Sequence, residues 1–234
     1  MKRVKIHMQK YISPSICCCD LSHLEESVRA LEQLSVEYIH VDIMDGEFVS
    51  NYCLGTEFIP LLHRLTNIPL DIHLMITQPD RKLDYFSFLP GDIVSIHAES
   101  TFHAQKALAA IRARGAKAGL AINPATPVEH CKWVLEDLDV ILIMTINPGF
   151  AGQKLVPQTL SKIAQARQLA NACGHEILLE VDGNVSFENA ARMSREGANI
   201  FVAGTSSLYC QSGTLEERCR RLRQAIQANQ SKAG

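Results

Sequence analysis

Two histidines and two aspartates of this 234-residue chain have side chains of the kind that bind a divalent cation. His40 and Asp42 lie two positions apart in one apolar run. His73 lies in the next apolar run, and Asp182 ends a later one. Neutral imidazole and carboxylate groups suit zinc, iron(II), manganese or cobalt, and the lack of cysteine in the set disfavours a purely structural zinc site. A cation held in this way could act as a Lewis acid in catalysis.

The alternation of residue types predicts that these side chains share one face of a sheet. Successive side chains of a strand point to opposite faces, and at residues 37–44 and 69–76 branched aliphatic residues alternate with polar residues or methionine. The aliphatic face packs against helices, so the other face points inward, where an unpaired charge is costly. This inward set comprises His40, Asp42, Met44, Asp71, His73, Met75, Glu180 and Asp182. Either these residues converge on a cation, or they form a buried ion-pair network that only stabilises the fold.

The elements that position these residues alternate between short apolar runs and longer amphipathic runs. Strands are predicted at residues 11–16, 37–44, 69–76, 92–97, 116–122, 140–145, 177–181 and 200–203, and helices at 22–34, 56–65, 80–88, 102–114, 127–135, 157–172, 187–195 and 215–228. Strands separated by helices pair in parallel through right-handed crossovers. Eight such units in this length favour an α/β fold of the closed (β/α)8 TIM barrel type, with an open doubly wound sheet as the alternative. We expect one such domain over residues 1–234, with residues 1–10 as an N-terminal extension.

Three glycine-containing loops follow the last three predicted strands, at residues 147–153, 182–184 and 203–207. Glycine lets backbone N–H groups approach an anion closely, and a helix start adds positive potential. Phosphate sites of TIM barrels commonly use the loops after strands seven and eight. No lysine or arginine is placed to help, so we expect the backbone to bind a phosphate. The candidate residues are Gly149, Phe150, Ala151, Gly152, Asp182, Gly183, Asn184, Gly204 and Thr205.

The composition narrows the class of protein. The formal net charge is −2, so no basic surplus exists to bind a nucleic acid or an acidic membrane surface. No apolar run is long enough to span a bilayer. The eight cysteines include no CxxC pair and are scattered through a chain large enough to fold without disulfides. We therefore expect a reduced, cytoplasmic protein.

Seven short motifs lie on these elements. They are residues 13–15 (SPS), 40–46 (HVDIMDG), 71–75 (DIHLM), 123–127 (NPATP), 144–153 (MTINPGFAGQ), 181–183 (VDG) and 204–205 (GT). With them the chain resembles the ribulose-phosphate 3-epimerase family over residues 12–228, with the motifs at 40–46 and 144–153 the most specific. The resemblance implies a TIM barrel of the ribulose-phosphate-binding type and a homo-oligomer, either a dimer or a hexamer.

The resemblance also implies roles for single residues. One divalent metal ion per chain would be held by His40, Asp42, His73 and Asp182, and the two aspartates would transfer the proton. Ser15 and His73 would also contact the substrate. Met44, Met75 and Met144 would line the reaction site, although simple core filling explains methionines almost as well.

Some positions depart from the commonest pentulose-phosphate pattern of the family. Asn184 stands where a second glycine is usual, and the runs at residues 13–20, 50–51 and 204–207 also differ. Ala151, the run at 204–206 and the cysteine-containing first loop are more similar to the allulose-6-phosphate 3-epimerase branch. The substrate is therefore either D-ribulose 5-phosphate, epimerised to D-xylulose 5-phosphate, or D-allulose 6-phosphate, epimerised to D-fructose 6-phosphate.

Inverting a carbon next to a ketone requires removal of its proton and its return to the other face. We expect an isomerase in which Asp42 and Asp182 act as base and acid around a metal-stabilised enediolate. A phosphate-barrel lyase, a decarboxylase or an aldolase, is a second possibility, but such enzymes usually place a lysine at a strand end. Lys117 stands at the start of its strand and Lys154 in a loop. A non-catalytic sugar-phosphate-binding protein is the third possibility.

Three further residues carry expectations. His97 and Glu99 end the fourth predicted strand, where we expect them to pair with each other or to support the site. Trp133 is expected to pack between its helix and the barrel.

Overall fold

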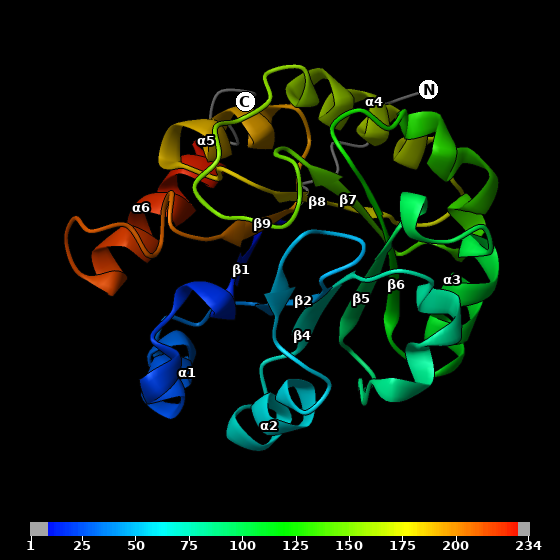
Figure 1. The fold of residues 1–234 in the computed structure, drawn as a ribbon. Helices are drawn as coiled ribbons and strands as arrows, with labels where there is room; N and C mark the ends of the chain where they lie inside the picture. The colour runs from blue at the N-terminus through cyan, green and yellow to red at the C-terminus, as the bar shows by residue number, and fades with distance from the viewer. Residues whose placement is uncertain (1–8, 229–234) are drawn as a thin grey trace.

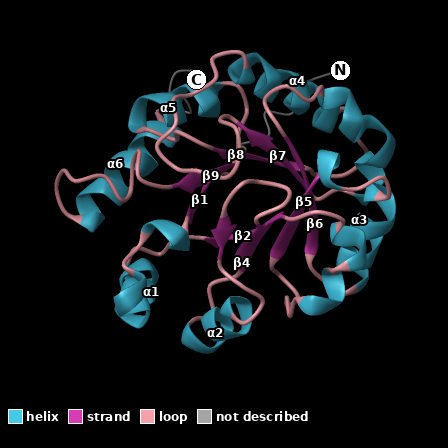
Figure 2. Ribbon diagram, viewed as in Figure 1, coloured by secondary structure: helices cyan, strands magenta, loops and turns pink. Residues whose placement is uncertain are grey.

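The computed structural model describes residues 9–228, in which eight parallel strands form one curled sheet surrounded by helices (Figures 1 and 2). The strands, in chain order, are β1 Tyr11–Pro14, β2 Ile39–Asp45, β4 Leu70–Met75, β5 Ile93–His97, β6 Lys117–Ile122, β7 Val140–Met144, β8 Leu178–Asp182 and β9 Ile200–Ala203. The helices are α1 Leu24–Gln33, α2 Phe58–Leu65, α3 Ala104–Ala113, α4 Thr159–Asn171, α5 Phe187–Arg195 and α6 Leu215–Gln227.

The sheet closes between its first two strands. β1 pairs with β9 along its whole length, and the parallel bridge between Ser15 and His40 joins the end of β1 to β2. The N–H group of Tyr38 donates to the carbonyl oxygen of Ile12 at 3.4 Å on the same seam. The prediction of a (β/α)8 TIM barrel is therefore confirmed, and the open-sheet alternative is wrong.

Alternation along β7 separates the core into an outer layer and an inner layer. Ile141 and Ile143 belong to the large apolar cluster between strands and helices, whereas Leu142 and Met144 pack with Ala121 in a separate cluster. Val140 joins a third cluster, with Ile93 and Ile200, at the amino-terminal end of the strands. Odd-numbered and even-numbered side chains of β7 therefore pack on opposite sides of the strand, which is the arrangement of a packed barrel.

Two predicted helices have a different local structure. The segment predicted as a helix at residues 80–88 contains two 3-10 turns, Pro79–Arg81 and Leu83–Tyr85, and becomes extended at Phe86. Phe86 and Phe88 are both buried, and their two-residue spacing suits an extended chain. The segment after Pro127 is a 3-10 helix, Val128–Asp137. Its buried positions Val128 and Cys131 are three residues apart, which matches the 3-10 repeat.

The structure also differs from the prediction in smaller features. A short antiparallel strand, β3 Tyr52–Cys53, pairs with the end of β2 and was not predicted. Trp133 does not pack against the barrel, since it is 86% exposed. Residues 1–8 of the predicted N-terminal extension lie outside the described residues, whereas Lys10 donates to the carbonyl oxygen of Ala198 and so contacts the barrel. Among residues 9–228, no helix combines the length and apolarity that crossing a membrane requires.

Candidate active site

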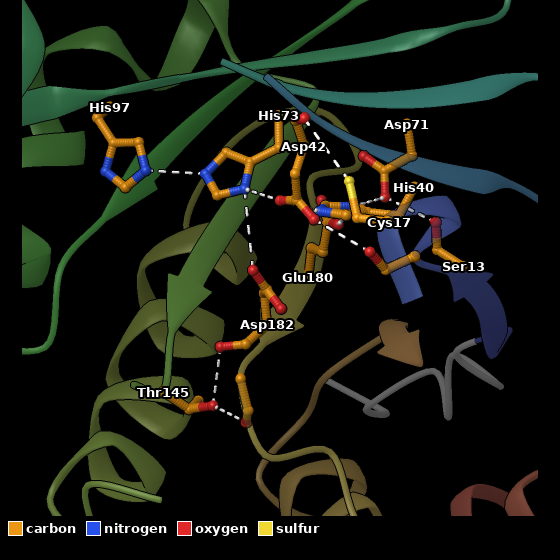
Figure 3. Close-up of polar contacts among 12 residues, drawn as sticks. Ser13, Cys17, His40, Asp42, Asp71, His73, His97, Thr145, Glu180 and Asp182 are labelled. Carbon is orange, nitrogen blue, oxygen red and sulfur yellow. Dashed lines mark hydrogen bonds and ion pairs between the residues drawn. The ribbon is translucent and has the colours of Figure 1, made fainter. Parts of the chain in front are cut away.

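Four donor side chains meet at the carboxyl end of the barrel. His40, Asp42, His73 and Asp182 each offer one atom, and these atoms all lie within 4.8 Å of one another. Asp42 Oδ1 lies 3.1 Å from His40 Nε2 and 3.3 Å from His73 Nδ1. His73 Nδ1 is in turn 3.8 Å from Asp182 Oδ2 (Figure 3). The parallel register pairs Asp42 with His73, so β2 and β4 bring these two groups together directly.

A buried polar layer beneath the cluster fixes the orientation of His40. Asp71 Oδ2 lies 2.8 Å from His40 Nδ1 and accepts a hydrogen bond from the Ser13 hydroxyl at 2.7 Å. His40, Asp71 and Glu180 are all fully buried. Burial raises the pKa of Glu180 well above its ordinary value, and the Asp71 carboxylate adds to this effect. If Glu180 is neutral, Asp71 is the carboxylate that accepts the hydrogen bond from Nδ1–H of His40.

A second row of side chains orients His73. Its Nε2 atom lies 2.8 Å from Nε2 of His97, whose Nδ1 is 3.3 Å from Glu99 Oε2. Glu99 also accepts hydrogen bonds from the Asn123 N–H and the Thr126 hydroxyl. Burial lowers the pKa of His97 to about 4, against the opposing effect of Glu99, so this ring is neutral near pH 7. With its Nδ1–H directed to Glu99, His97 accepts from Nε2–H of His73, as predicted for a supporting pair.

These tautomers test whether a cation fits the cluster. In the tautomers that would bind a metal, each imidazole gives its N–H to the buried layer, so Nε2 of His40 and Nδ1 of His73 would present lone pairs toward Asp42 Oδ1, at 3.1 Å and 3.3 Å. Without a cation, a proton on Nε2 of His40 donates to Asp42 instead. Burial opposes protonation of His40, yet Asp42 and Asp71 raise its pKa well above the ordinary value. The donor set thus attracts a positive charge at this point, and it fits a divalent cation with nitrogen and oxygen ligands.

The surroundings shift the pKa values of the two aspartates in opposite directions. Burial alone would raise the pKa of Asp42, but His40 and His73 hold it well below its ordinary value. Burial raises the pKa of Asp182, with the Asp42 carboxylate adding to the rise against the effect of His40. Two carboxyl groups whose pKa values are pushed apart can serve as a base and an acid within one site.

A cavity of about 250 Å³ opens above the cluster, and both aspartates reach it. Its wall includes every residue of the predicted substrate-binding set except His73. These residues are Ser15, Met44, Met75, Met144, Gly149, Phe150, Ala151, Gly152, Asp182, Gly183, Asn184, Gly204 and Thr205. His73 is fully buried beneath the aspartates and does not line the wall. No lysine or arginine of the described residues lines the cavity.

Glycine is needed where the loop after β8 turns. Gly183 has φ +108°, and a Cβ atom there would lie 2.4 Å from Cγ1 of Ile146 and 2.9 Å from its backbone nitrogen. Thr145 joins the same loop to β7, because its N–H and its hydroxyl both donate to the carbonyl oxygen of Asp182 at 2.7 Å and 2.9 Å. The loops after β7 and β8 are therefore held together next to the second aspartate.

The predicted substrate-binding set omits several residues of the cavity wall. Cys17, Cys18 and Cys53 line it, and Asn51 donates from Nδ2 to the carbonyl oxygen of Gly149 at 2.7 Å. Asn51 thereby ties the loop after β2 to the loop after β7. These four residues lie in loops or at a strand end, where no periodic pattern marks which side chains face a cavity.

Comparisons with known proteins identify the family. A model of the ribulose-phosphate 3 epimerase family matches residues 11–208. A ribulose-phosphate 3-epimerase from Bacillus subtilis is 41% identical over 202 residues, which are 86% of this chain and 93% of that protein. The ribulose-phosphate 3-epimerase of Escherichia coli K12 is 37% identical over 201 residues, 85% of this chain and 89% of that protein.

Solved structures with low sequence identity share the fold. A 3-keto-L-gulonate-6-phosphate decarboxylase from Vibrio cholerae superposes with a TM-score of 0.66 at 12% identity, covering 94% of this chain and 98% of that one. A 3-hexulose-6-phosphate synthase from Salmonella typhimurium gives a TM-score of 0.63 at 11% identity, covering 93% and 99%. At such identities the likeness concerns the barrel alone.

Proposed function

The chain belongs to the ribulose-phosphate 3-epimerase family, and we propose that it inverts carbon 3 of D-ribulose 5-phosphate to give D-xylulose 5-phosphate. It is an isomerase of the epimerase class. The observation that supports the proposed reaction best is the pair Asp42 and Asp182, two carboxyl groups of one donor cluster that line the same cavity.

The two aspartates divide the proton transfer between them. The ionised carboxylate of Asp42 removes the proton of carbon 3 from one face of the substrate, and the carboxyl group of Asp182 returns one to the other face. The roles exchange when the reaction runs backwards. Ser15 holds the base in position, because its hydroxyl donates to Asp42 Oδ2 at 3.0 Å.

His40, Asp42, His73 and Asp182 would hold one divalent cation, of zinc, iron(II), manganese or cobalt. When bound, it would supply Lewis-acid stabilisation of the negative charge that develops on the substrate. Met44, Met75 and Met144 line the same cavity, where their apolar side chains exclude water and so strengthen the electrostatic interactions.

The phosphate group would bind at the other end of the cavity, next to Gly183 and Gly204. Both residues line the wall, and glycine at these positions lets the backbone approach the anion closely. This end lies on the loops after β8 and β9, the usual phosphate position of the fold. Binding there fixes the distance between the phosphate and the carbon that the aspartates reach.

A hexulose phosphate is the second candidate substrate. Cys17, Cys18 and Thr205 line the cavity, and these residues lie in the segments that depart from the commonest pentulose-phosphate pattern. Because these departures lie on the cavity wall, D-allulose 6-phosphate, epimerised to D-fructose 6-phosphate, is the alternative substrate.

The deciding experiment compares rates with D-ribulose 5-phosphate and D-allulose 6-phosphate on the metal-reconstituted protein in deuterated water. The proposal expects deuterium at carbon 3 of the preferred ketose and turnover of that ketose at the higher rate. Deuterium at a carbon other than carbon 3 would contradict 3-epimerisation, and release of an aldehyde fragment would instead support an aldolase. Binding without exchange into either sugar would support a non-catalytic binding protein.

We also propose a cytoplasmic homo-oligomer, a dimer or a hexamer. Phe102 and Trp133 are large apolar side chains that are 103% and 86% exposed, and an interface could cover them. All eight cysteines are free, which agrees with a reducing compartment. Light scattering coupled to size-exclusion chromatography measures the assembly, and a monomeric mass would contradict this part of the proposal.

A further inference from the structure

Two thiols meet at the wall of the catalytic cavity. Sγ of Cys17 lies 2.9 Å from Sγ of Cys53, and both residues are partly buried and line the cavity. Cys17 lies in the 3-10 turn Ile16–Cys18 that follows β1, and Cys53 ends β3. Figure 3 shows Cys17 next to Asp42, with its sulfur 3.9 Å from the backbone oxygen of that residue. The pair therefore joins two segments, 36 residues apart in sequence, beside a proposed catalytic group.

The surroundings make this pair different from the other cysteines. Within residues 9–228, the hydrogen bonds include no second contact between two cysteine sulfurs. Cys131 and Cys219 are buried in the apolar core, and Cys173 and Cys210 contact polar groups away from the cavity. Only the pair at the wall combines a thiol partner with access for a small polar reactant through the cavity.

We propose that Cys17 and Cys53 form a reactive dithiol that a hydroperoxide oxidises to a disulfide across the wall of the catalytic cavity. One thiolate attacks the peroxide oxygen, which breaks the O–O bond, gives a sulfenic acid and releases water or an alcohol. The second thiol then attacks the sulfenic sulfur, which forms the S–S bond and expels a second water molecule. The two thiols lose two protons and two electrons in total, and the peroxide takes them up.

The disulfide would act on the site through the segments that it joins. The turn that carries Cys17 follows Ser15, whose hydroxyl donates to Asp42, and Cys53 pairs in register with Met44 of β2. A covalent bond would hold both segments in a fixed relation at the cavity wall. Small displacements of positioning groups are enough to slow catalysis strongly. Oxidation should therefore inhibit the enzyme reversibly, a consequence that rests on the proposed function.

The experiment uses the full chain, reduced and loaded with zinc, because zinc does not take part in redox reactions. Hydrogen peroxide is added in small excess, free thiols are alkylated, and peptides are identified by mass spectrometry. We expect a peptide pair cross-linked through Cys17 and Cys53, and a fall in epimerase activity of about ten-fold or more that dithiothreitol reverses. Oxidation that leaves these two thiols free to react with the alkylating agent would overturn the proposal.

Matched variants separate the dithiol from other targets of peroxide. Cys53→Ser and Cys17→Ser, each compared with its own untreated activity, should resist inhibition, whereas Cys210→Ser should respond as the unchanged protein does. Equal inhibition of Cys53→Ser would mean that peroxide acts elsewhere, and the regulatory part would be wrong. The cross-link is read by mass alone, so it is measured even if neither ketose phosphate proves to be a substrate. Lack of activity before oxidation would contradict the proposed function and leave the dithiol chemistry to its own measurement.

Discussion

His73 and His97 face each other through their Nε2 atoms at 2.8 Å, so one imidazole orients the other. Because Glu99 accepts the Nδ1–H of His97, the shared position carries a single proton, and it belongs to His73. His73 is left with a lone pair on Nδ1, the atom directed at Asp42 and Asp182. The row from Glu99 to His73 thus prepares a ligand atom, as carboxylate and imidazole partners of metal-binding histidines commonly do.

The first prediction concerns this row. His97→Phe removes the acceptor for His73 while keeping a ring in the buried position, so it should lower the affinity for zinc by about 10–100-fold. His97→Gln, which offers an oxygen acceptor, should recover part of the loss. Competition with a chromophoric chelator measures the affinity directly, without reference to activity.

The exposed His130→Gln is the matched control for that titration, and it should bind zinc as the unchanged chain does. A His97→Phe variant with unchanged affinity would show that the His73 tautomer is fixed by something other than His97. A variant that loses its fold, seen as a lost thermal transition, would be replaced in the comparison by His97→Gln.

The second prediction concerns the proton transfer. Asp182→Asn keeps the size of the side chain but cannot carry the proton, so exchange at carbon 3 should fall by about 10²–10⁴-fold. Deuterium incorporation is measured after saturation with metal, because the same residue belongs to the proposed ligand set. Asp84→Asn, whose carboxylate is 87% exposed, is the control and should exchange normally. Normal exchange in Asp182→Asn would exclude it as a proton carrier.

Much of the site follows from side-chain alternation. His40 and Asp42 in one strand, and His73 in another, alternate with aliphatic residues. Their common face could therefore be predicted without knowing how the strands pair. The barrel followed from the number of alternating units. The separate cluster of Leu142 and Met144 shows that the same alternation also divides the apolar core.

Other features depend on register and loop geometry, which periodicity does not contain. β4 and β5 pair His73 with Ser95, so His97 reaches His73 from two residues further along, a relationship that only the pairing reveals. Cys17 and Cys53 meet because a turn and a short strand lie side by side. The helix predicted at residues 127–135 is the 3-10 helix Val128–Asp137, and a buried spacing of three residues is compatible with both helix types.

The third prediction is a dependence of stability on pH. Hydrogen bonds from His97, Thr126 and the Asn123 N–H outweigh the effect of burial and lower the pKa of Glu99 from 4.5 to about 2. Since the folded pKa lies below the unfolded one, the stabilisation is complete above pH 4.5 and is lost as the pH falls toward 2. The side chain is only 24% exposed, so the full shift corresponds to about 3 kcal/mol as an upper value.

Glu99→Gln should therefore lower the free energy of unfolding near pH 7, and its difference from the unchanged chain should shrink between pH 4.5 and 2. Urea titrations of the chelator-treated chain measure this difference without bound metal. Glu136→Gln, at a side chain that is 85% exposed, is the control. A difference that stays constant over this range would mean that Glu99 stabilises the fold through contacts that do not depend on its charge.

The fourth prediction separates phosphate binding from stability at Gly204. The residue lines the cavity, its backbone lies outside the left-handed region, and an added Cβ would make an ordinary contact of 3.5 Å with Cys18 Sγ. Gly204→Ala should therefore fold normally, with stability changed by less than about 0.5 kcal/mol. The new methyl group would keep the backbone away from the anion. Losing one hydrogen bond to a charged group costs about 1.5–3 kcal/mol, so KM should rise by about 10–100-fold with kcat nearly unchanged.

The matched control is Gly174→Ala, because an added Cβ there meets nothing within 4 Å and the residue does not line the cavity. Both variants should unfold like the unchanged chain, and only Gly204→Ala should show the higher KM. Inhibition by inorganic phosphate gives a second measurement, since its inhibition constant should rise in parallel with KM if the methyl group disturbs the phosphate itself. A higher KM with unchanged phosphate inhibition would mean that Gly204 contacts the sugar, and the phosphate would have to bind at another part of the wall.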